Sequence, residues 1–484
     1  MVINVILAIL VLSIIIIIHE FGHFIVAKAN GITVVEFSLG FGPKLLHFKK
    51  GETEYCLKML PFGGACIMLG EDFMEADGEE DYEEAKDNTD GTDSVRKAAV
   101  PDVAGKAYTD GDISAGGYIS QKAKAEALEK GYDMSKSFAN KSVWSRIAVI
   151  AAGPVFNFIL AFVCGIVIIG SIGYDPCTVD VIYEDSPATS AGLQEGDKII
   201  AVNNQKVIFY RDYSFYRYYH AEKPMDITYI RAGEKQKTTL TPEYVRKEKY
   251  QIGITLEQDG TINTVSDGMP AALAGIIKGD KITAINGVAV DNSTQISEQI
   301  NKCNGQSIDV TVKRNGSNVT LTMTPKYVEN EYYYTGFACY GAREKVSPLM
   351  TLRYAASEVR YSVNTVIRSL GMMFTGKVGI NDLSGPVGTV SIMSDIVEES
   401  KADGAYYVFI NLLNLAGLIS SNLGIMNLLP IPALDGGRLV FLILEVLRGK
   451  PVKKEHEGIV HFIGMIFLLA LMVYIMFKDI RGLF

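Results

Sequence analysis

The chain has 484 residues, of which 48% are hydrophobic and 21% charged, and its formal net charge is −9. The length allows several domains, and the apolar content excludes disorder throughout the chain. Because an acidic chain does not offer the basic surface that nucleic-acid binding needs, we expect no nucleic-acid partner. Six scattered cysteines without a CxxC pair exclude a disulfide scaffold.

Four uncharged, apolar runs are long enough to cross a membrane. The first has neither a basic start nor a small-residue cleavage site, so we interpret it as a span and not as a signal peptide. The prolines Pro430 and Pro432 predict that the third helix breaks near its end. The runs are residues 1–18, 147–173, 404–434 and 458–477, and the segments built on them are 1–26, 147–173, 404–447 and 456–478.

Basic residues predict the direction of these spans. No Lys or Arg precedes the first run, whereas several follow it, precede the second run, and separate the third from the fourth. Since positive charge favours the cytoplasmic side, we expect both termini and residues 174–403 to be extracytoplasmic. The fold class expected is a multi-pass α-helical membrane protein in the lipid bilayer.

An internal repeat lies in the extracytoplasmic block. Residues 186–203, SPATSAGLQEGDKIIAVN, match residues 269–286, MPAALAGIIKGDKITAIN. The pattern resembles PDZ domains, which bind peptide tails by adding a strand to a sheet edge. We predict two PDZ-like α/β domains, at 177–257 and 258–330; the alternative is another small α/β fold with a Gly-Asp turn.

The remaining segments connect these parts. Residues 32–70 predict short strands with Gly-rich turns, a membrane-associated β-hairpin region on the cytoplasmic side. Residues 71–140 are first acidic and then rich in Gly, Ala, Asp and Lys, which predicts a flexible insert. Residues 346–400 predict an amphipathic connector near the membrane.

An HExxH motif, His19-Glu20-Phe21-Gly22-His23, follows the first apolar run directly. On a helix, residues four apart share one face about 6 Å apart along the axis. Two imidazoles so placed can hold one Zn²⁺, and the Glu can activate a water. Such polar residues in a span are costly, so the motif predicts a functional site. The alternative is an interfacial helix cap.

A catalytic zinc site needs a third ligand. His47, His220, His456 and His461 are candidates by residue type, but Asp435 is favoured because it ends a Pro-broken apolar run and precedes two glycines. The first and third spans run in the same direction, so their cytoplasmic ends should bring His19 and Asp435 to one depth.

A polar residue inside the second span, Asn157, is open to two interpretations. It can bond to a neighbouring helix, or it can hold the backbone of a substrate.

Together these residues resemble the site-2 protease family of intramembrane zinc metalloproteases, of the bacterial type with tandem PDZ domains. The resemblance covers nearly the whole chain outside residues 71–135. Its motifs are HEFGH at 19–23, EFSLGFGPK at 36–44, AGPVFN at 152–157, LSGPVG at 383–388 and the run from Asn427 to Gly437.

The resemblance implies a role for each site residue. His19, His23 and Asp435 would bind zinc, Glu20 would be the general base, and Asn157 and Asn427 would position the substrate. Strands around 52–69 would pair with an unwound substrate. The PDZ pair would admit only single-span membrane proteins already trimmed outside, such as anti-sigma factors or remnant signal peptides. The expected location is a bacterial cell membrane.

Two other functions compete with an intramembrane protease. One is an inactive membrane scaffold that presents PDZ domains to partner tails; the intact ligands and base disfavour it. The other is a metal transporter, which predicts inverted repeats of spans, and the four runs show none.

Overall fold

The computed structural model describes residues 2–71, 131–376 and 385–481, together with residues 379 and 383. It divides into two compact units. The first combines Met1–Tyr174 with Arg343–Phe484, and the second is Asp175–Ala342.

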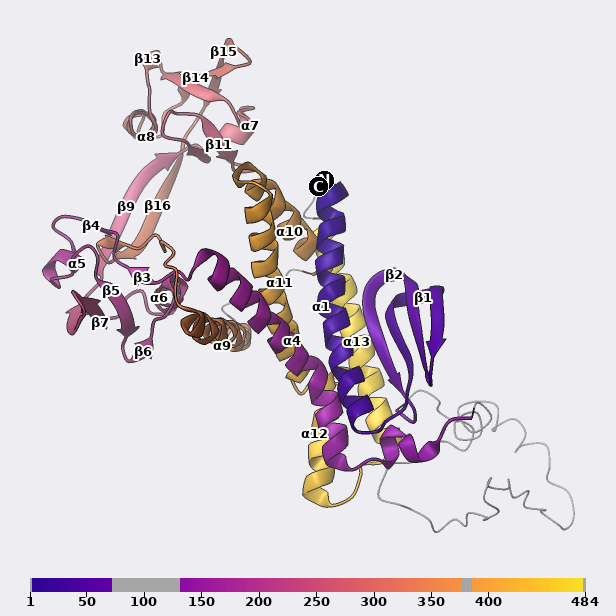
Figure 1. The fold of residues 1–484 in the computed structure, drawn as a ribbon. Helices are drawn as coiled ribbons and strands as arrows, with labels where there is room; N and C mark the ends of the chain where they lie inside the picture. The colour runs from indigo at the N-terminus through magenta and orange to yellow at the C-terminus, as the bar shows by residue number, and fades with distance from the viewer. Residues whose placement is uncertain (1, 72–130, 377–378, 380–382, 384, 482–484) are drawn as a thin grey trace, which may run out of the picture. The chain divides into compact units, whose positions relative to one another are not determined.

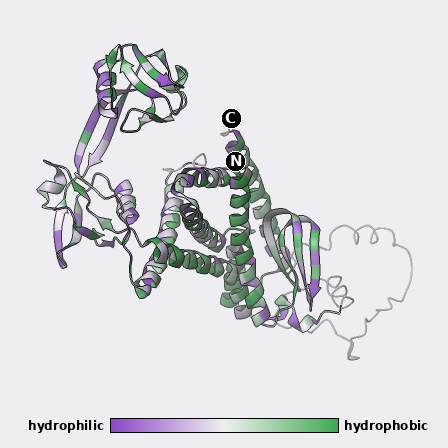
Figure 2. Cartoon of the chain, turned by 45° about the horizontal axis from the view of Figure 1, so that its top comes forward, coloured by the Kyte–Doolittle hydropathy of each residue, from purple (hydrophilic) through white to green (hydrophobic). Residues whose placement is uncertain are grey.

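Four helices of the described chain are long and apolar enough to span a membrane, and all lie in the first unit. They are α1 (Val2–Ala29), α4 (Val143–Ile172), α11 (Ala405–Leu428) and α13 (Lys454–Arg481). Figure 2 shows these helices coloured mostly as hydrophobic along their length. Helix α1 begins and α13 ends at the same end of this unit (Figure 1).

The third of these helices is shorter than the predicted run. Helix α11 ends at Leu428 because Leu429 is extended, as expected of a residue before Pro430. After a loop through Pro432, helix α12 (Asp435–Arg448) begins at the predicted third ligand. The break that the prolines predict is therefore present.

Two further helices form the segment between the second unit and α11. They are α9 (Pro348–Phe374) and α10 (Pro386–Ser400). Helix α9 packs on α4, where a Cβ built on Gly165 would lie 3.3 Å from Ala355. The start of α10 is held by Asp479 of α13, whose Oδ2 accepts the N–H groups of Gly385 and Gly388 at 2.9 and 2.8 Å.

Two long bent strands, β1 (Val34–Lys50) and β2 (Thr53–Met68), pair with each other beside α1. Both fold back on themselves, so Leu39 lies opposite both Leu57 and Gly64. Short 3₁₀ helices η1 (Met134–Lys136) and η2 (Phe138–Asn140) lead into α4. The predicted acidic insert lies, over residues 72–130, outside the described residues, as does Ser384 of the LSGPVG motif.

The second unit contains two similar sheets with separate cores. The first has the order β3-β5-β7-β8, with β6 beside β5, and the second has the order β13-β12-β14-β15. In both, the Asp of the Gly-Asp turn is buried and pairs with an Arg 34 residues later, Asp197 with Arg231 and Asp280 with Arg314. The hydrogen bonds from Arg314 hold the pKa of Asp280 below its usual value.

The elements of the first sheet domain are β3 (Cys177–Thr178), β4 (Val181–Ile182), α5 (Pro187–Ser190), β5 (Lys198–Val202), β6 (Gln205–Lys206), α6 (Tyr210–Tyr219), β7 (Met225–Arg231) and β8 (Glu234–Leu240). The elements of the second are β10 (Ile254–Leu256), β11 (Ile262–Val265), α7 (Pro270–Leu273), β12 (Lys281–Ile285), β13 (Val288–Ala289), α8 (Ser293–Lys302), β14 (Ile308–Arg314) and β15 (Ser317–Met323).

The second domain is inserted into the first, where the sequence predicts two domains in tandem. Strands β9 (Glu243–Gln251) and β16 (Lys326–Tyr334) pair over their whole length and carry the chain out and back. The returning strand β17 (Phe337–Ala338) pairs with β4, and Phe337 and Cys339 join the first core. The difference arises because these few returning residues carry no repeat signal of their own.

Candidate metal centre

The two histidines of the HExxH motif lie on one face of α1, as their spacing requires. Both are buried, with exposed fractions of 7%, and their Nε2 atoms are 3.3 Å apart. An uninterrupted helix of apolar residues positions them, so their relative placement is fixed locally by the sequence.

Asp435 meets these histidines from the first residue of α12. Its Oδ2 is 3.2 Å from Nε2 of His19 and 3.4 Å from Nε2 of His23. This oxygen is buried, yet it accepts no hydrogen bond of good geometry. The three ligand atoms lie within 4.8 Å of one another, so the donor set fits a divalent metal with an open position.

Glycine makes room for this cluster at Gly153 of α4. A Cβ built there would lie 2.3 Å from Nε2 of His23 and 2.8 Å from Cε1 of His19. No heavy atom tolerates such distances, so α4 can approach the histidines only because this residue has no side chain. The sequence places Gly153 in a motif but cannot reveal the contact, which depends on how two distant helices pack.

The loop before Asp435 is held by a fourth helix. Ala433 has a φ of 73°, which is uncommon for a residue with a side chain. Its N–H donates to Nδ1 of His461 on α13 at 2.9 Å. A Cβ on Gly436 would lie 2.0 Å from the carbonyl oxygen of Leu429, so the turn into α12 requires glycine there.

Glu20 lies between the histidines in sequence and is close enough to His19, His23 and Asp435 to interact with each electrostatically. Its Cγ faces Gly64 in the second half of β2, since a Cβ on Gly64 would lie 2.9 Å from it. The edge of the β region therefore passes directly beside the predicted general base.

The two predicted substrate-binding asparagines contact opposite sides of one imidazole. Nδ2 of Asn157 is 3.1 Å from Nδ1 of His19, and Nδ2 of Asn427 is 3.3 Å from Nε2 of the same ring. Asn157 is fully buried on α4, and Asn427 lies at the end of α11.

The other histidines that the sequence offers as third ligands lie outside this cluster. His47 is exposed on β1 and pairs with Glu54 at 2.9 Å. His461 holds the loop at Ala433, and His220 belongs to the second unit. His456 is exposed in the first turn of α13.

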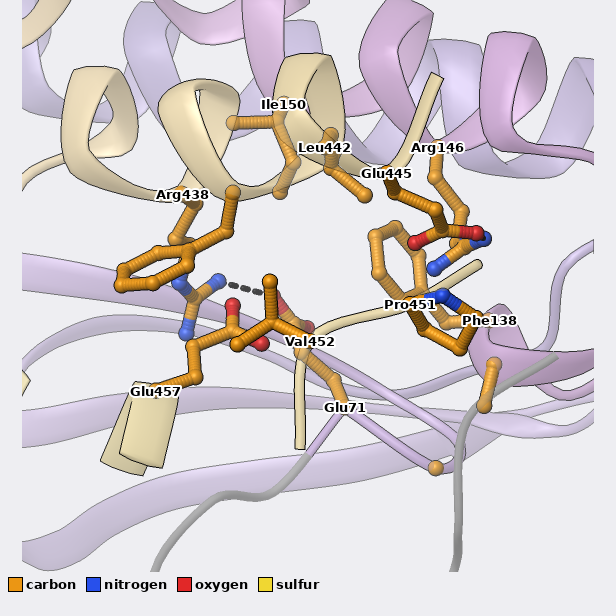
Figure 3. A pocket seen from close by; sticks show the side chains of 13 residues that line it. Glu71, Phe138, Arg146, Ile150, Arg438, Leu442, Glu445, Pro451, Val452 and Glu457 are labelled. Carbon is orange, nitrogen blue, oxygen red and sulfur yellow. Dashed lines mark hydrogen bonds and ion pairs between the residues drawn. The ribbon is translucent and has the colours of Figure 1, made fainter. Parts of the chain in front are cut away.

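A small pocket of about 50 Å³ adjoins α12, one turn beyond Asp435. Figure 3 shows the side chains of two ion pairs that line it and marks the pair of Arg438 and Glu71 with a dashed line. Arg438 of α12 pairs with Glu71, which follows β2, and Glu445 of α12 pairs with Arg146 near the start of α4. These pairs hold both ends of α12, and the sequence alone predicts neither pairing.

Comparison with known proteins agrees with this geometry. The model of peptidase family M50 matches residues 7–471, and the chain belongs to this family of zinc-dependent peptidases. The chain is thus a zinc metalloprotease of the membrane, as the resemblance to site-2 proteases predicts.

The relatives are named as zinc metalloproteases or as a regulator of sigma-W protease, and they have a similar length. The chain is 30% identical to the zinc metalloprotease RasP of Bacillus licheniformis, over 99% of both chains. It is 29% identical to the regulator of sigma-W protease RasP of Bacillus subtilis, over 96% of this chain and 95% of that one. Among solved structures, the HtrA3 PDZ domain matches 18% of this chain and 93% of that one, with 20% identity and a TM-score of 0.16. The fold of residues 175–342 therefore follows from their own strand order and not from this match.

Proposed function

We propose that this metalloprotease cleaves single-span membrane proteins within the bilayer, with zinc held by His19, His23 and Asp435. The observation that carries the proposal is the convergence of three ligand atoms within 4.8 Å, two of them from a helix apolar and long enough to span a membrane. Polar side chains inside a membrane-spanning helix are costly, and cleavage of a soluble substrate would not require them there.

Glu20 acts as the general base in this proposal. Zinc, when bound, polarises the scissile carbonyl and the attacking water. The Glu20 carboxylate takes a proton from that water as its oxygen adds to the carbonyl carbon, and then gives the proton to the leaving amide nitrogen. Asn427 faces the metal side of His19, where its amide can hold the substrate backbone next to the reacting bond.

The β region supplies a place for an unwound substrate. A helical substrate hides its peptide carbonyls in internal hydrogen bonds, so a segment must become extended before it is cut. Strand β2 passes beside Glu20 at Gly64, and a substrate strand paired there would recover backbone hydrogen bonds. The PDZ-like domains would receive peptide tails left by a first cut, with anti-sigma factors or remnant signal peptides as the substrate types.

The proposed topology puts both termini outside the cell and the metal centre near the cytoplasmic side. Two observations support it: most basic residues next to the spans lie on the proposed cytoplasmic side, with Lys478 and Arg481 weakly opposing it, and α1 begins at the end of the unit where α13 ends. The proposed location is the bacterial cell membrane.

The test compares the native chain with Glu20→Gln in liposomes that contain a single-span substrate, with bound zinc measured in both. We expect one zinc in each protein, and cleavage within the span by the native chain alone, with activity lowered at least about 100-fold in the variant. Removing zinc with a chelator should abolish cleavage, and adding zinc should restore it. A native chain that binds zinc but leaves every single-span substrate intact, while cutting soluble peptides, would contradict the proposal.

A further inference from the structure

The imidazole of His19 is contacted at both nitrogens, and the two contacts have different consequences. Nε2 faces Asp435 at 3.2 Å and Asn427 at 3.3 Å, so this nitrogen is on the metal side. Nδ1 faces the Asn157 amide at 3.1 Å, on the side of α4. A neutral imidazole carries one proton, and a metal can be bound only by the nitrogen that lacks it.

The other histidine shows how this proton is controlled. Nδ1 of His23 lies 2.8 Å from the carbonyl oxygen of Val149. A carbonyl can only accept, so Nδ1 of His23 must carry the proton and Nε2 presents its lone pair to the cluster. The backbone of α4 therefore sets the tautomer of His23.

For His19, the group that faces Nδ1 belongs to a side chain and not to the backbone. Val149, Gly153 and Asn157 are spaced four residues apart and form a stripe along α4, and His19 and His23 have the same spacing on α1. Along the two helices these residues pair in reverse order. Val149 contacts His23, Asn157 contacts His19, and Gly153, between them, lies against both rings. Asn157 thus occupies the position at which His19 needs an acceptor for Nδ1–H.

The Asn157 amide can supply that acceptor. Its Oδ1 is buried and has no hydrogen-bond partner, while its Nδ2 points at the ring. The two ends of an amide have nearly the same shape, and a half-turn of the group exchanges them. After the exchange Oδ1 accepts from Nδ1–H of His19, and Nε2 is free to bind metal.

The surroundings of Asn157 suit a residue that must not move. It is fully buried, and its backbone carbonyl accepts a hydrogen bond from the Ser420 hydroxyl of α11 at 2.9 Å. A substrate-binding side chain would need access to the substrate, and Asn427, on the metal side of the ring, is the one placed to have it.

We propose that Asn157 is a positioning residue for the metal centre, which holds His19 with its proton on Nδ1 so that Nε2 faces the zinc. This replaces the substrate-holding role that the resemblance implies for Asn157, and it rests on the proposed zinc site. Loss of such a partner lowers metal affinity about 10- to 100-fold.

The test measures zinc affinity in the full-length protein in detergent, by competition with a chromophoric chelator. The variants are Asn157→Ala, Asn157→Asp and Asn427→Ala. We expect Asn157→Ala to weaken zinc binding about 10- to 100-fold. Asn157→Asp keeps an acceptor for Nδ1–H and should stay within a few fold of the native affinity, which also shows that the site folds without the amide. Asn427→Ala is the matched control, and its zinc affinity should not change.

Cleavage at saturating zinc separates the two roles of Asn157. Under the positioning role, Asn157→Ala regains most of its activity with an unchanged KM, whereas Asn427→Ala shows a raised KM. Native zinc affinity together with a raised KM in Asn157→Ala would overturn the inference in favour of substrate binding. If the native chain itself bound no zinc, the proposed function would fail, and that result is visible before any Asn157 variant is compared.

Discussion

The candidate metal centre depends on single residues, including a glycine that has no side chain. The spacing of His19 and His23, and the position of Asp435 after a Pro-broken run, are readable in the sequence because helix periodicity and proline chemistry are local. The need for glycine at position 153 is not local, since it arises only when α4 packs against α1. The sequence could therefore predict that these three side chains come together, but not the surface of α4 against which they pack.

The replacement Gly153→Ala tests this contact. The added methyl group would lie 2.3 Å from His23 Nε2, so the rings or the helix must shift, and we expect zinc affinity to fall by about 10-fold or more. Zinc retained after dialysis against a zinc buffer measures the loss. Gly170→Ala on the same helix is the control, because the nearest atom there, in Thr351, is 3.9 Å away. Equal zinc retention in the two variants would contradict the role given to Gly153.

Among the elements, α12 shows how a short helix can carry a ligand to a distant partner. It begins at Asp435, and its two ion pairs join it to Glu71, which follows β2, and to the start of α4. Breaks at Pro430 and Pro432 were predictable from the sequence, but these pairs were not, since charges so far apart in sequence give no pattern. The pairing of Arg438 with Glu71 also fixes the last described residue before 72–130.

Charge replacement at this pair should loosen α12. Arg438→Gln takes the cation away from the buried carboxylate of Glu71, and Glu71→Gln removes one ion pair of Arg438, so we expect each change to cost about 1–3 kcal/mol in the free energy of unfolding. The exchange Glu71→Arg with Arg438→Glu should recover part of it. Thermal unfolding in detergent measures the change, and a double-mutant cycle gives the coupling.

An exposed ion pair of the same unit provides the control for that cycle. Lys401 and Glu398 pair on the surface, and Lys401→Gln should cost less than about 1 kcal/mol. A coupling between Glu71 and Arg438 no larger than that of this surface pair would contradict the fastening role.

For the whole molecule, the insertion of one sheet domain into the other is the feature that sequence reasoning did not reach. The repeat at 186–203 and 269–286 was visible because both copies share a Gly-Asp turn. The closing strand β17 has two residues and no counterpart in the repeat, so only its pairing with β4 shows where the first domain ends.

A deletion can distinguish nested from tandem domains. Because β9 and β16 pair residue by residue, with Val245 opposite Tyr332, residues 246–331 can be replaced by an Asn-Gly turn. We expect this protein to fold, to keep its zinc and to cleave a substrate without an extracytoplasmic tail within a few fold of the native rate.

The matched control removes residues 258–342, which takes the closing strand as well. Phe337 and Cys339 then leave the first core, and the first domain should unfold, as protease sensitivity of the region would show. A first domain that stays protected in this control would mean that its core does not need the returning strand.

The nested arrangement also reverses the order in which the chain can finish its parts during synthesis. The second domain is continuous and is complete once β15 has been made, whereas the first must wait for β17, which is translated later. The metal centre is completed later still, because Asp435 follows both domains in the chain. A ribosome-bound chain that ends before residue 435 would hold the two histidines and the proposed base but not the proposed third ligand, so under the proposed mechanism peptide-bond cleavage begins only after nearly the whole protein has been translated.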